Sequence, residues 1–406
     1  MVIRSEERTA LRPCPICQGT RVERLHHQSF VLTENHPLAD GYDVVCCETC
    51  GFVYADTAVT QRAYDQFYAD SSKYADVQTG TGGGDLPWDD RRLEETAREI
   101  ACLVPDVDAK IVDIGCANGG LLKWLSRLGR RRLVGVDPAV ACVRAAERFP
   151  GVTGMVGTLF ELPAELENAD CISLSHVLEH VRDLGTALRA VFEKLRPGGM
   201  LYVEVPDATR YAEYVTAPLQ DFNTEHINHF SLQSLRSLLQ ANGFVARYEG
   251  QKTIEASAGV PYPALWIMAE RSAAPVTGVT PAIERDAELR TSIERYIVRS
   301  STQISVIDAH LDRVLTDVDQ IVVWGAGQTI LKLLAVSRLA RARIAAFVDT
   351  NPMLHGKHLR GAPILSPEAL GSFPQPILVG SLISQEPIAR RIRELGLPNR
   401  VLFLQP

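Results

Sequence analysis

The sequence predicts an α/β protein with a parallel sheet at its centre. Five short apolar runs with the character of β-strands alternate with amphipathic stretches, which is typical of a parallel sheet covered by helices. These runs are residues 110–115, 132–137, 154–157, 171–175 and 200–206. A second strand, glycine turn and helix begin near residue 318, and two Cys-x-x-Cys pairs precede the first sheet.

Length and composition limit the classes of protein. A chain of 406 residues with 46% hydrophobic residues is expected to form two or three domains. The net charge of −7 and the pI of about 5.9 argue against a general nucleic-acid binder, which usually has a basic face. We expect no secretory signal, because the N-terminal MVIRSEERTALRPC lacks an apolar core, and no membrane span, because no apolar run approaches the roughly 18 residues required. Nine scattered cysteines favour a reducing compartment, so we expect a cytoplasmic protein.

The order of these features predicts four segments. Residues 1–58 form a zinc-binding domain, and residues 59–272 form the first α/β domain. Residues 273–317 form a linker rich in Ala, Pro, Val and Thr, followed by a helix. Residues 318–406 form a second Rossmann-like α/β domain.

The two Cys-x-x-Cys pairs predict a structural zinc site. They are Cys14 with Cys17 and Cys47 with Cys50, and together they supply the four thiolates of a tetrahedral site. About 29 residues separate the pairs, so we expect a small sheet or hairpin between them. Because a closed four-cysteine site has no open position, the ion would support folding. A disulfide, reactive cysteines and a histidine-containing ligand set are the alternatives. The alternative ligands are His26, His27 and His36, and Cys46 is expected to bind nothing.

A glycine-rich turn after the first strand predicts a nucleotide-like cofactor. Residues 111–120 read IVDIGCANGG, and the second strand ends at Asp137, whose carboxylate can hold ribose hydroxyls. Taken alone, these features also fit a dinucleotide-binding fold. Asp113, two residues before the first glycine, favours a cationic amino-acid moiety over a pyrophosphate.

This order of strands, with HVLEH after the fourth strand and LRPGGMLYVEVP at the fifth, resembles class I S-adenosylmethionine-dependent methyltransferases over about residues 85–250. Ala117 stands where the family has its middle glycine. The resemblance implies S-adenosylmethionine as the cofactor. The cofactor-binding residues expected from it are Asp113, Gly115, Cys116, Ala117, Gly119, Asp137, Pro138, Thr158, Leu159, Ser175 and His176. For His176 and the nearby His180, capping or packing of the next helix is the alternative role.

A histidine-rich segment after the fifth strand predicts the methyl-acceptor site. Residues 221–232 read DFNTEHINHFSL, in which Glu225 and His226 can form a base, because a carboxylate raises the basicity of an imidazole. His229 is a further catalytic candidate. The alternative is a polar hinge between domains.

The whole chain resembles a three-part family, the C-methyltransferases of nucleotide-linked keto-deoxysugars. Its parts are a zinc-binding domain, a methyltransferase core and a C-terminal Rossmann-like domain that helps to hold the substrate. The family's motif is similar to YHEHLSYFS, in which Tyr, Glu and His are linked to proton removal beside a ketone. Glu225 and His226 match it, but Asn223, a candidate substrate residue, replaces the first tyrosine. Tyr68 or Tyr74, near a glycine-rich stretch that resembles a lid, could supply the missing phenol.

The C-terminal domain begins with a second glycine turn, WGAGQT, followed by a strand that ends at Asp349. Gly325 and Gly327 could cradle a phosphate on backbone amides, with Asp349 and Asn351 close to a nucleotide. His355 and Lys357 could lie there as well. The alternative is a turn that serves packing alone.

The sequence therefore predicts a C-methyltransferase for a nucleotide-activated sugar or a similar small intermediate of natural-product biosynthesis. An O- or N-methyltransferase acting on a natural product or a surface glycan precursor is the second reading. A non-catalytic zinc protein that binds S-adenosylmethionine or a nucleotide is the third. The expected partner is a small molecule, and neither nucleic acid nor membrane is expected. A monomer and a dimer are both compatible with the sequence.

Overall fold

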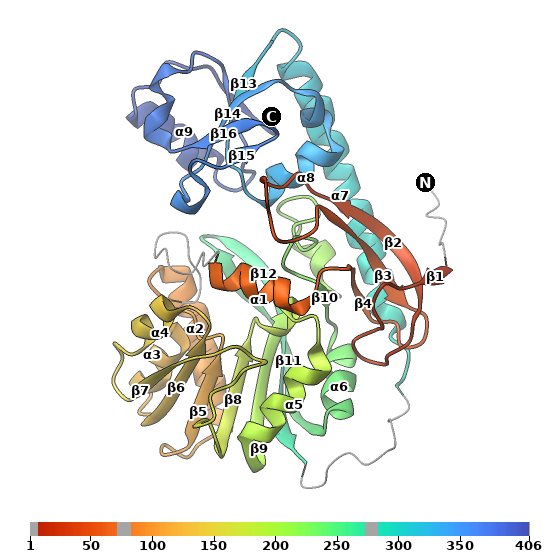
Figure 1. Cartoon of the computed structure of the whole chain (residues 1–406), viewed down its shortest axis with the longest axis vertical. Coiled ribbons are helices and arrows are strands. Elements are labelled where there is room, and N and C mark those ends of the chain that lie inside the picture. Colours follow the sequence, from red (N-terminus) through yellow and green to blue (C-terminus); the bar gives the residue numbers. More distant parts are fainter. Residues whose placement is uncertain (1–6, 71–82, 273–282, 406) are drawn as a thin grey trace. The chain divides into compact units, whose positions relative to one another are not determined.

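The computed structural model describes residues 7–70, 83–272 and 283–405 (Figure 1). The chain divides into two compact units, each assembled from separate stretches of sequence. The first unit comprises the residues up to Glu23, Val45–Tyr214 and Glu225–Ser292. The second comprises Arg24–Val44, Val215–Thr224 and the residues from Ile293 onward.

The first unit contains a seven-stranded sheet in the order β11-β12-β9-β8-β5-β6-β7. The five strands from β9 to β7 are parallel, and β12 and β11 add an antiparallel edge. The prediction of five strands in a parallel sheet is confirmed. The strands are β5 (Lys110–Ile114), β6 (Arg132–Asp137), β7 (Val152–Val156), β8 (Ala169–Ser175), β9 (Leu195–Pro206), β11 (Phe244–Ser257) and β12 (Val260–Arg271).

Helices cover this sheet because each connection between parallel strands must cross back over it. Leu93 and Ile100 of α2 and Leu122 and Leu125 of α3 form one apolar cluster with strand residues such as Ile111. α5 packs on β9, and α6 packs on β11 and β12. The helices are α1 (Gln61–Asp70), α2 (Pro87–Leu103), α3 (Gly120–Arg127), α4 (Val140–Ala146), α5 (Leu184–Lys194) and α6 (Leu232–Ala241), with 3-10 turns η2 (Leu178–His180) and η3 (Tyr211–Glu213).

The cysteine-rich part of the chain forms a five-stranded sheet in the order β1-β2-β3-β4-β10. Two of its strands, β2 and β3, lie between the two Cys-x-x-Cys pairs, as the long spacing predicted. The sheet closes on β10, a short strand that comes from the histidine-rich segment and pairs antiparallel with β4. The strands are β1 (Glu7–Thr9), β2 (Arg21–Ser29), β3 (Gly41–Cys47), β4 (Val53–Asp56) and β10 (Asn228–His229).

The second unit is another α/β sheet, in the order β15-β16-β14-β13-β17-β18. All neighbours pair in parallel except β15 with β16. The prediction of a second Rossmann-like sheet is therefore confirmed in its topology. Its strands are β13 (Ile321–Trp324), β14 (Ile344–Val348), β15 (His358–Leu359), β16 (Ala362–Leu365), β17 (Ile377–Val379) and β18 (Val401–Phe403). The helices are α7 (Ala287–Val314), of which the part from Ile293 belongs to this unit, α8 (Gln328–Val336) and α9 (Gln385–Glu394), with turns η4 (Arg338–Arg341), η5 (Pro352–Leu354) and η6 (Pro367–Ser372).

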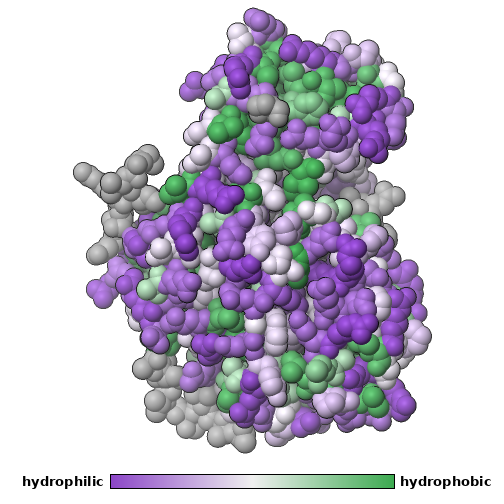
Figure 2. Space-filling view, turned by 180° about the vertical axis from the view of Figure 1, so that it is seen from behind, coloured by the Kyte–Doolittle hydropathy of each residue, from purple (hydrophilic) through white to green (hydrophobic). Residues whose placement is uncertain are grey.

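The surface is mostly hydrophilic on the face that Figure 2 shows, with smaller hydrophobic areas between. Large exposed apolar side chains such as Leu11, Tyr248 and Val298 come from different elements, as is normal for a folded protein. Among the described helices, none is long and apolar enough to span a membrane.

Candidate functional site

The turn from β5 into α3 has a backbone that only small residues tolerate well. Gly115, Ala117 and Gly119 all have positive φ angles, of 78°, 45° and 80°. A Cβ atom on Gly115 would lie 2.9 Å from Cγ2 of Val177, so that glycine is required by space as well as by conformation. The turn therefore brings backbone amides to the end of the sheet with no side chain in the way.

Asp137 fixes this turn against the next one. Its Oδ2 accepts a hydrogen bond from the amide of Ala117 (3.0 Å), and its Oδ1 accepts one from the amide of Ala139 (2.8 Å). Burial raises the pKa of this carboxyl group, while the two amides oppose the shift by stabilising the charged form. The acidic residue at the end of β6 is thus held in place before any ligand arrives.

These two turns form one wall of a cavity at the carboxyl ends of β5, β6 and β8. All but one of the residues expected to bind the cofactor line this cavity. They are Asp113, Gly115, Cys116, Ala117, Asp137, Pro138, Thr158, Leu159, Ser175 and His176. The exception is Gly119, whose Cβ would instead meet Ala146 of α4 at 2.7 Å. The glycine at that position serves the packing of two helices.

Asp113 is the most perturbed acid of the cavity. It is 4% exposed, and burial raises the pKa of its carboxyl group to about 7; the nearby Asp137 raises it further, while Ser173 and Arg92 oppose the shift. A cationic group that entered the cavity would compensate the cost of ionising this carboxyl. The site therefore suits a ligand with a positive charge.

One face of α1 completes the cavity, and of its lining residues only Tyr68 was expected from the sequence. Gln61, Asp65 and Tyr68 line the cavity at a spacing of four and three residues, which puts them on one face of the helix. α1 crosses the end of the sheet above these strands (Figure 1). Gln61 also accepts a hydrogen bond from the amide of Arg182 (2.8 Å), which fixes the helix to the loop after η2. The spacing of these polar residues, four and then three positions apart, is the sequence signal that could have identified this face of the helix.

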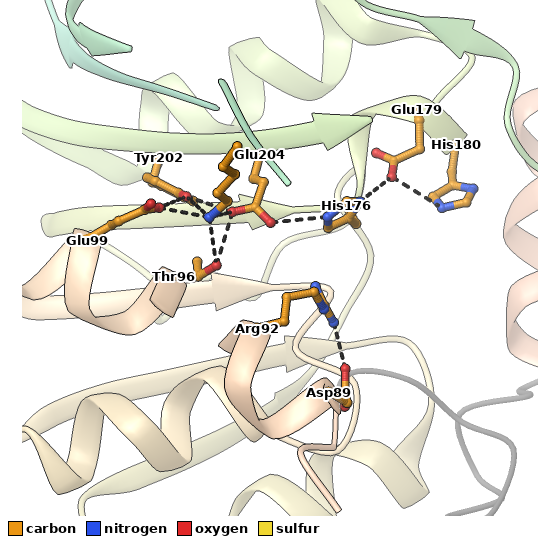
Figure 3. Close-up of polar contacts among 10 residues, drawn as sticks. Asp89, Arg92, Thr96, Glu99, His176, Glu179, His180, Tyr202 and Glu204 are labelled. Atoms are coloured by element: carbon orange, nitrogen blue, oxygen red, sulfur yellow. Dashed lines mark hydrogen bonds and ion pairs between the residues drawn. The ribbon is translucent and has the colours of Figure 1, made fainter. Parts of the chain in front are cut away.

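Behind the cavity wall lies a buried network of charges (Figure 3). Glu204 on β9 is 0% exposed and forms an ion pair with Lys252 Nζ at 2.6 Å. It also accepts hydrogen bonds from Thr96 (3.0 Å) and His176 Nε2 (3.1 Å). The pKa of Glu204 is held well below its usual value: burial alone would raise it, but Lys252 and His176 outweigh burial.

His176 joins this network to the rim of the cavity. Its Nδ1 lies 3.1 Å from Oε1 of Glu179, while its Nε2 contacts Glu204. Burial alone would lower the pKa of His176, but the two carboxylates outweigh it and raise that pKa. His176 also has a φ of 55°, a strained conformation for a residue with a side chain, and such strain is common at functional sites.

The histidine-rich segment lies beside η2. The imidazole of His226 packs edge-on against that of His180, with ring centroids 4.9 Å apart. Nδ1 of His180 lies 2.9 Å from the Tyr68 hydroxyl and 3.1 Å from the carbonyl oxygen of Glu225. The amide of Ile227 donates to the carbonyl of Glu179 (2.8 Å). These contacts bring Glu225 and His226 to His180, which lines the cavity.

The two remaining catalytic candidates are His229 and Tyr74. His229 is 0% exposed on β10 and does not line the cavity; burial, assisted by Arg12, lowers its pKa to about 3. A histidine buried in this way is neutral at physiological pH. Tyr74 lies outside the described residues, so Tyr68 is the phenol that the structure places at the site.

The four expected zinc ligands come together in the first unit. The sulfur atoms of Cys14 and Cys50 lie 3.5 Å apart, and those of Cys17 and Cys47 lie 3.4 Å apart. All four lie within 4.8 Å of one another, and Cys46 is not part of the group. None of the cysteines forms a disulfide, and the sulfur spacing suits thiolates around one ion. The donor set therefore fits a structural zinc ion.

The second unit repeats the arrangement of the first turn. The amide of Gly325 donates to the carbonyl of Val348 (2.6 Å). Asp349, at the end of β14, accepts hydrogen bonds from the amides of Ala326 (2.8 Å) and Asn351 (2.9 Å). Gly327 precedes α8 with extended backbone angles.

Asn223, the remaining substrate candidate, also belongs to the second unit. It is half-buried, and its carbonyl accepts a hydrogen bond from the Tyr42 hydroxyl (2.8 Å). The next residue, Thr224, accepts one from Gln328 at the start of α8 (2.8 Å). The segment that leads to Glu225 is thus attached to the second glycine turn.

The sheet order, the glycine turn after β5 and the acid after β6 define a nucleotide-binding α/β domain of the class I methyltransferase type. Residues 88–249 match the family model described as a methyltransferase domain, and this part of the chain is a methyltransferase domain.

Two curated relatives support the same class. A probable S-adenosylmethionine-dependent methyltransferase of Mycolicibacterium smegmatis is 31% identical over 137 residues, which are 33% of this chain and 51% of that protein. A ubiquinone biosynthesis O-methyltransferase of Bartonella tribocorum is 34% identical over 120 residues, which are 28% of this chain and 48% of that protein. The chain spans about half the length of the curated relatives it matches.

Among solved structures, the chain is similar to the 1,6-didemethyltoxoflavin-N1-methyltransferase of Burkholderia thailandensis. That likeness has 19% identity and a TM-score of 0.41, and it covers 54% of this chain and 95% of the other.

Proposed function

We propose that the protein transfers a methyl group from S-adenosylmethionine to a carbon atom of a nucleotide-activated keto-sugar or a similar small intermediate. The methyltransferase domain and the acidic cavity support the donor. The observation that carries the proposal is the contact of His180 with both the carbonyl of Glu225 and the ring of His226, which puts a possible base beside the cavity.

The chemistry would then run in two steps. His226, assisted by Glu225, takes a proton from the carbon beside the ketone, and the electron pair of that C–H bond forms an enolate. The enolate carbon then bonds to the methyl group, and the electrons of the methyl–sulfur bond remain on sulfur as a thioether. The enzyme contributes mainly by holding the carbon and the sulfonium in line.

The proposal also assigns a role to the N-terminal cysteine-rich part and to the second unit. The four-cysteine group would hold a zinc ion that stabilises the N-terminal part, and the second unit would hold the nucleotide of the acceptor near Gly325 and Asp349. Such an enzyme would act in the cytoplasm on a small molecule. Its resemblance to three-part sugar C-methyltransferases supports this organisation, although Asn223 stands where that family has a tyrosine.

O-methylation of a natural product or glycan precursor is the second candidate. Curated relatives, including those of Homo sapiens and Bartonella tribocorum, are named ubiquinone biosynthesis O-methyltransferases. In that reaction His226 would take a proton from a hydroxyl group, and no enolate would form.

Exchange in deuterium oxide separates the two reactions. With a nucleotide-linked keto-deoxysugar and without S-adenosylmethionine, a C-methyltransferase exchanges the hydrogen beside the ketone, and His226→Gln abolishes that exchange. His27→Gln is the matched control, because His27 is an exposed histidine that pairs with Asp43 and does not line the cavity. Absence of exchange, or full turnover by His226→Gln, would refute the base assignment. Failure of S-adenosylmethionine to bind in calorimetry would refute methyl transfer altogether.

A further inference from the structure

A second group of potential metal ligands lies at the rim of the cofactor cavity. Glu179, His180 and His226 each offer one ligand atom, and these atoms all lie within 4.8 Å of one another. Two imidazoles and one carboxylate are a donor set that binds divalent transition metals. Sets of three protein ligands are typical of catalytic sites, because they leave a position open for a substrate.

The hydrogen bonds of His180 determine which nitrogen faces this group. A carbonyl oxygen can only accept, so the 3.1 Å contact with Glu225 is a hydrogen bond when Nδ1 of His180 carries the proton, and the Tyr68 hydroxyl at 2.9 Å then accepts from the same nitrogen. In the neutral ring, Nε2 then carries a lone pair. Metal-binding histidines commonly donate their other N–H to a backbone carbonyl in this way, which orients the ring.

The Nε2 atom of His180 faces a carboxylate that it does not reach. It lies 3.9 Å from Oε1 of Glu179, which is too far for a hydrogen bond. A lone pair and a carboxylate oxygen repel each other unless a positive charge lies between them. That charge is either a proton on Nε2 or a metal ion.

Glu179 has a free position for such an ion. Its carboxylate is 1% exposed, and its Oε1 is oriented by His176 at 3.1 Å. Its Oε2 has no hydrogen-bond partner among the described residues, although a buried carboxylate oxygen without a partner is costly. Coordination of a cation would satisfy that oxygen.

The three residues are also held in place from outside the group. The amide of Ile227 donates to the carbonyl of Glu179 (2.8 Å). The side chain of Asn228 donates to the carbonyls of Leu178 (2.8 Å) and Val181 (2.7 Å). The segment that carries His226 is therefore bonded to the turn that carries Glu179 and His180, as a preorganised site requires.

We propose that Glu179, His180 and His226 bind one divalent transition-metal ion, such as Zn²⁺ or Co²⁺, with an open coordination position toward the cofactor cavity. The ion would bind the oxygen of the methyl acceptor and stabilise negative charge on it. It would thereby add a stabiliser of the oxyanion to a site in which Asn223 replaces the family's tyrosine. This use of the ion rests on the proposed function, but the metal site itself does not. A nitrogen of His226 that binds the ion cannot also take a proton. With the ion bound, Glu225 therefore replaces His226 as the base, and His226→Gln still abolishes the exchange because it removes a metal ligand.

Cobalt stoichiometry tests the site. The full chain and its variants are loaded with Co²⁺ and separated from free ion, and bound cobalt is measured per chain. The wild type is expected to retain one equivalent more than Glu179→Gln, His180→Gln and His226→Gln. His27→Gln, at an exposed histidine, should match the wild type. The charge-transfer band of cobalt thiolates reports the four-cysteine group and should be equal in all five proteins.

Equal cobalt content in all five proteins overturns the proposal and assigns the charge between Glu179 and His180 to a proton. If a histidine variant does not fold, as judged by circular dichroism, Glu179→Gln decides, because it preserves the shape of the side chain. A missing equivalent in a protein that does not bind S-adenosylmethionine supports the metal site and refutes the proposed function. Normal methyl transfer together with equal cobalt content supports the proposed function and refutes the metal site.

Discussion

Replacement of Asp113 by Asn should stabilise the ligand-free protein and abolish binding of S-adenosylmethionine. The pKa of Asp113 is raised from 3.8 to about 7 in the folded protein, chiefly by burial. Between these two pH values the folded state binds a proton that the unfolded chain has released. Stability therefore falls as the pH rises through this window, and the loss is complete above pH 7.

The size of the effect follows from the two pKa values. Their difference, at about 1.4 kcal/mol per pKa unit, corresponds to a cost on the order of 4 kcal/mol for the ionised carboxylate above pH 7. Asparagine cannot ionise, so the variant avoids this cost. The gain should be nearly absent at pH 4, where the wild-type carboxyl is protonated in the folded state.

Thermal unfolding at pH 4.5 and pH 8 measures the gain, and calorimetry measures the cofactor. The melting temperature of Asp113→Asn should exceed that of the wild type by several degrees at pH 8 and by little at pH 4.5. In the wild type, S-adenosylmethionine should bind more tightly as the pH rises to about 7, because its positive charge pairs with the ionised form. Asp108→Asn, at an exposed aspartate, is the control. Equal melting temperatures at pH 8, or undiminished cofactor affinity in the variant, would refute the reasoning.

Three further substitutions test other parts of the site. Gly115→Ala should destabilise the protein by about 1–3 kcal/mol in urea unfolding and weaken cofactor binding, because φ is positive and the new Cβ meets Val177; unchanged values for both would contradict this. If the four-cysteine group holds zinc as proposed, Cys14→Ser should lower the zinc content in metal analysis by one equivalent and lower the melting temperature, whereas wild-type zinc content would exclude Cys14 as a ligand. Glu204→Gln should cost about 3–5 kcal/mol above pH 5, because it leaves the buried Lys252 short of one carboxylate. Wild-type stability in that variant would mean that the ion pair contributes nothing.

The acid sensitivity of Glu204 follows from the same contacts. Since its pKa is lowered in the folded state, the stability that it contributes is present above the unfolded-chain value of 4.5. It is lost as the pH falls toward the folded-state pKa. The difference between wild type and Glu204→Gln should therefore shrink in acid, as it does for Asp113→Asn, but at high pH the first substitution destabilises the protein and the second stabilises it.

The sheets could be predicted from the sequence because their signals are local. The run at 110–115 becomes β5, with four of its five residues buried, since a strand covered on both faces has no polar alternation. The glycines around residue 117 and the acid at Asp137 likewise lie within one strand-helix-strand unit, from β5 through α3 to β6. Almost every residue that we expect to bind the cofactor lies at the cavity, because that unit and the parallel order of the strands bring them to the same edge of the sheet.

The buried network and the rim of the cavity could not be predicted in this way. Glu204 meets Lys252, 48 positions later, because β9 pairs with β12 and β12 pairs with β11. His180 meets the Glu225 carbonyl across a separation of 45 residues. A single sequence carries no signal for such pairs, since each depends on how several strands and helices are packed.

The two glycine turns of this chain share their backbone contacts but differ at one buried position. In both units the first strand leads into a glycine with positive φ, Gly115 or Gly325, whose amide donates to the last residues of the neighbouring strand. In both, an aspartate at the end of that neighbour accepts from two backbone amides. Two residues before the glycine, however, the first unit has Asp113 and the second has Val323, which is fully buried.

The aspartate in place of valine gives the first turn a negative charge that the second turn lacks. A buried carboxylate beside the amides disfavours a phosphate and favours a cation, whereas valine leaves the amides at the start of α8 without that negative charge. We therefore expect the first turn to hold the cationic methyl donor and the second to tolerate the anionic part of a nucleotide-linked acceptor. Val323→Asp should then weaken binding of a nucleoside diphosphate to the second unit and leave S-adenosylmethionine binding to the first unchanged. Unchanged nucleoside diphosphate affinity in that variant would mean that the second turn serves packing alone.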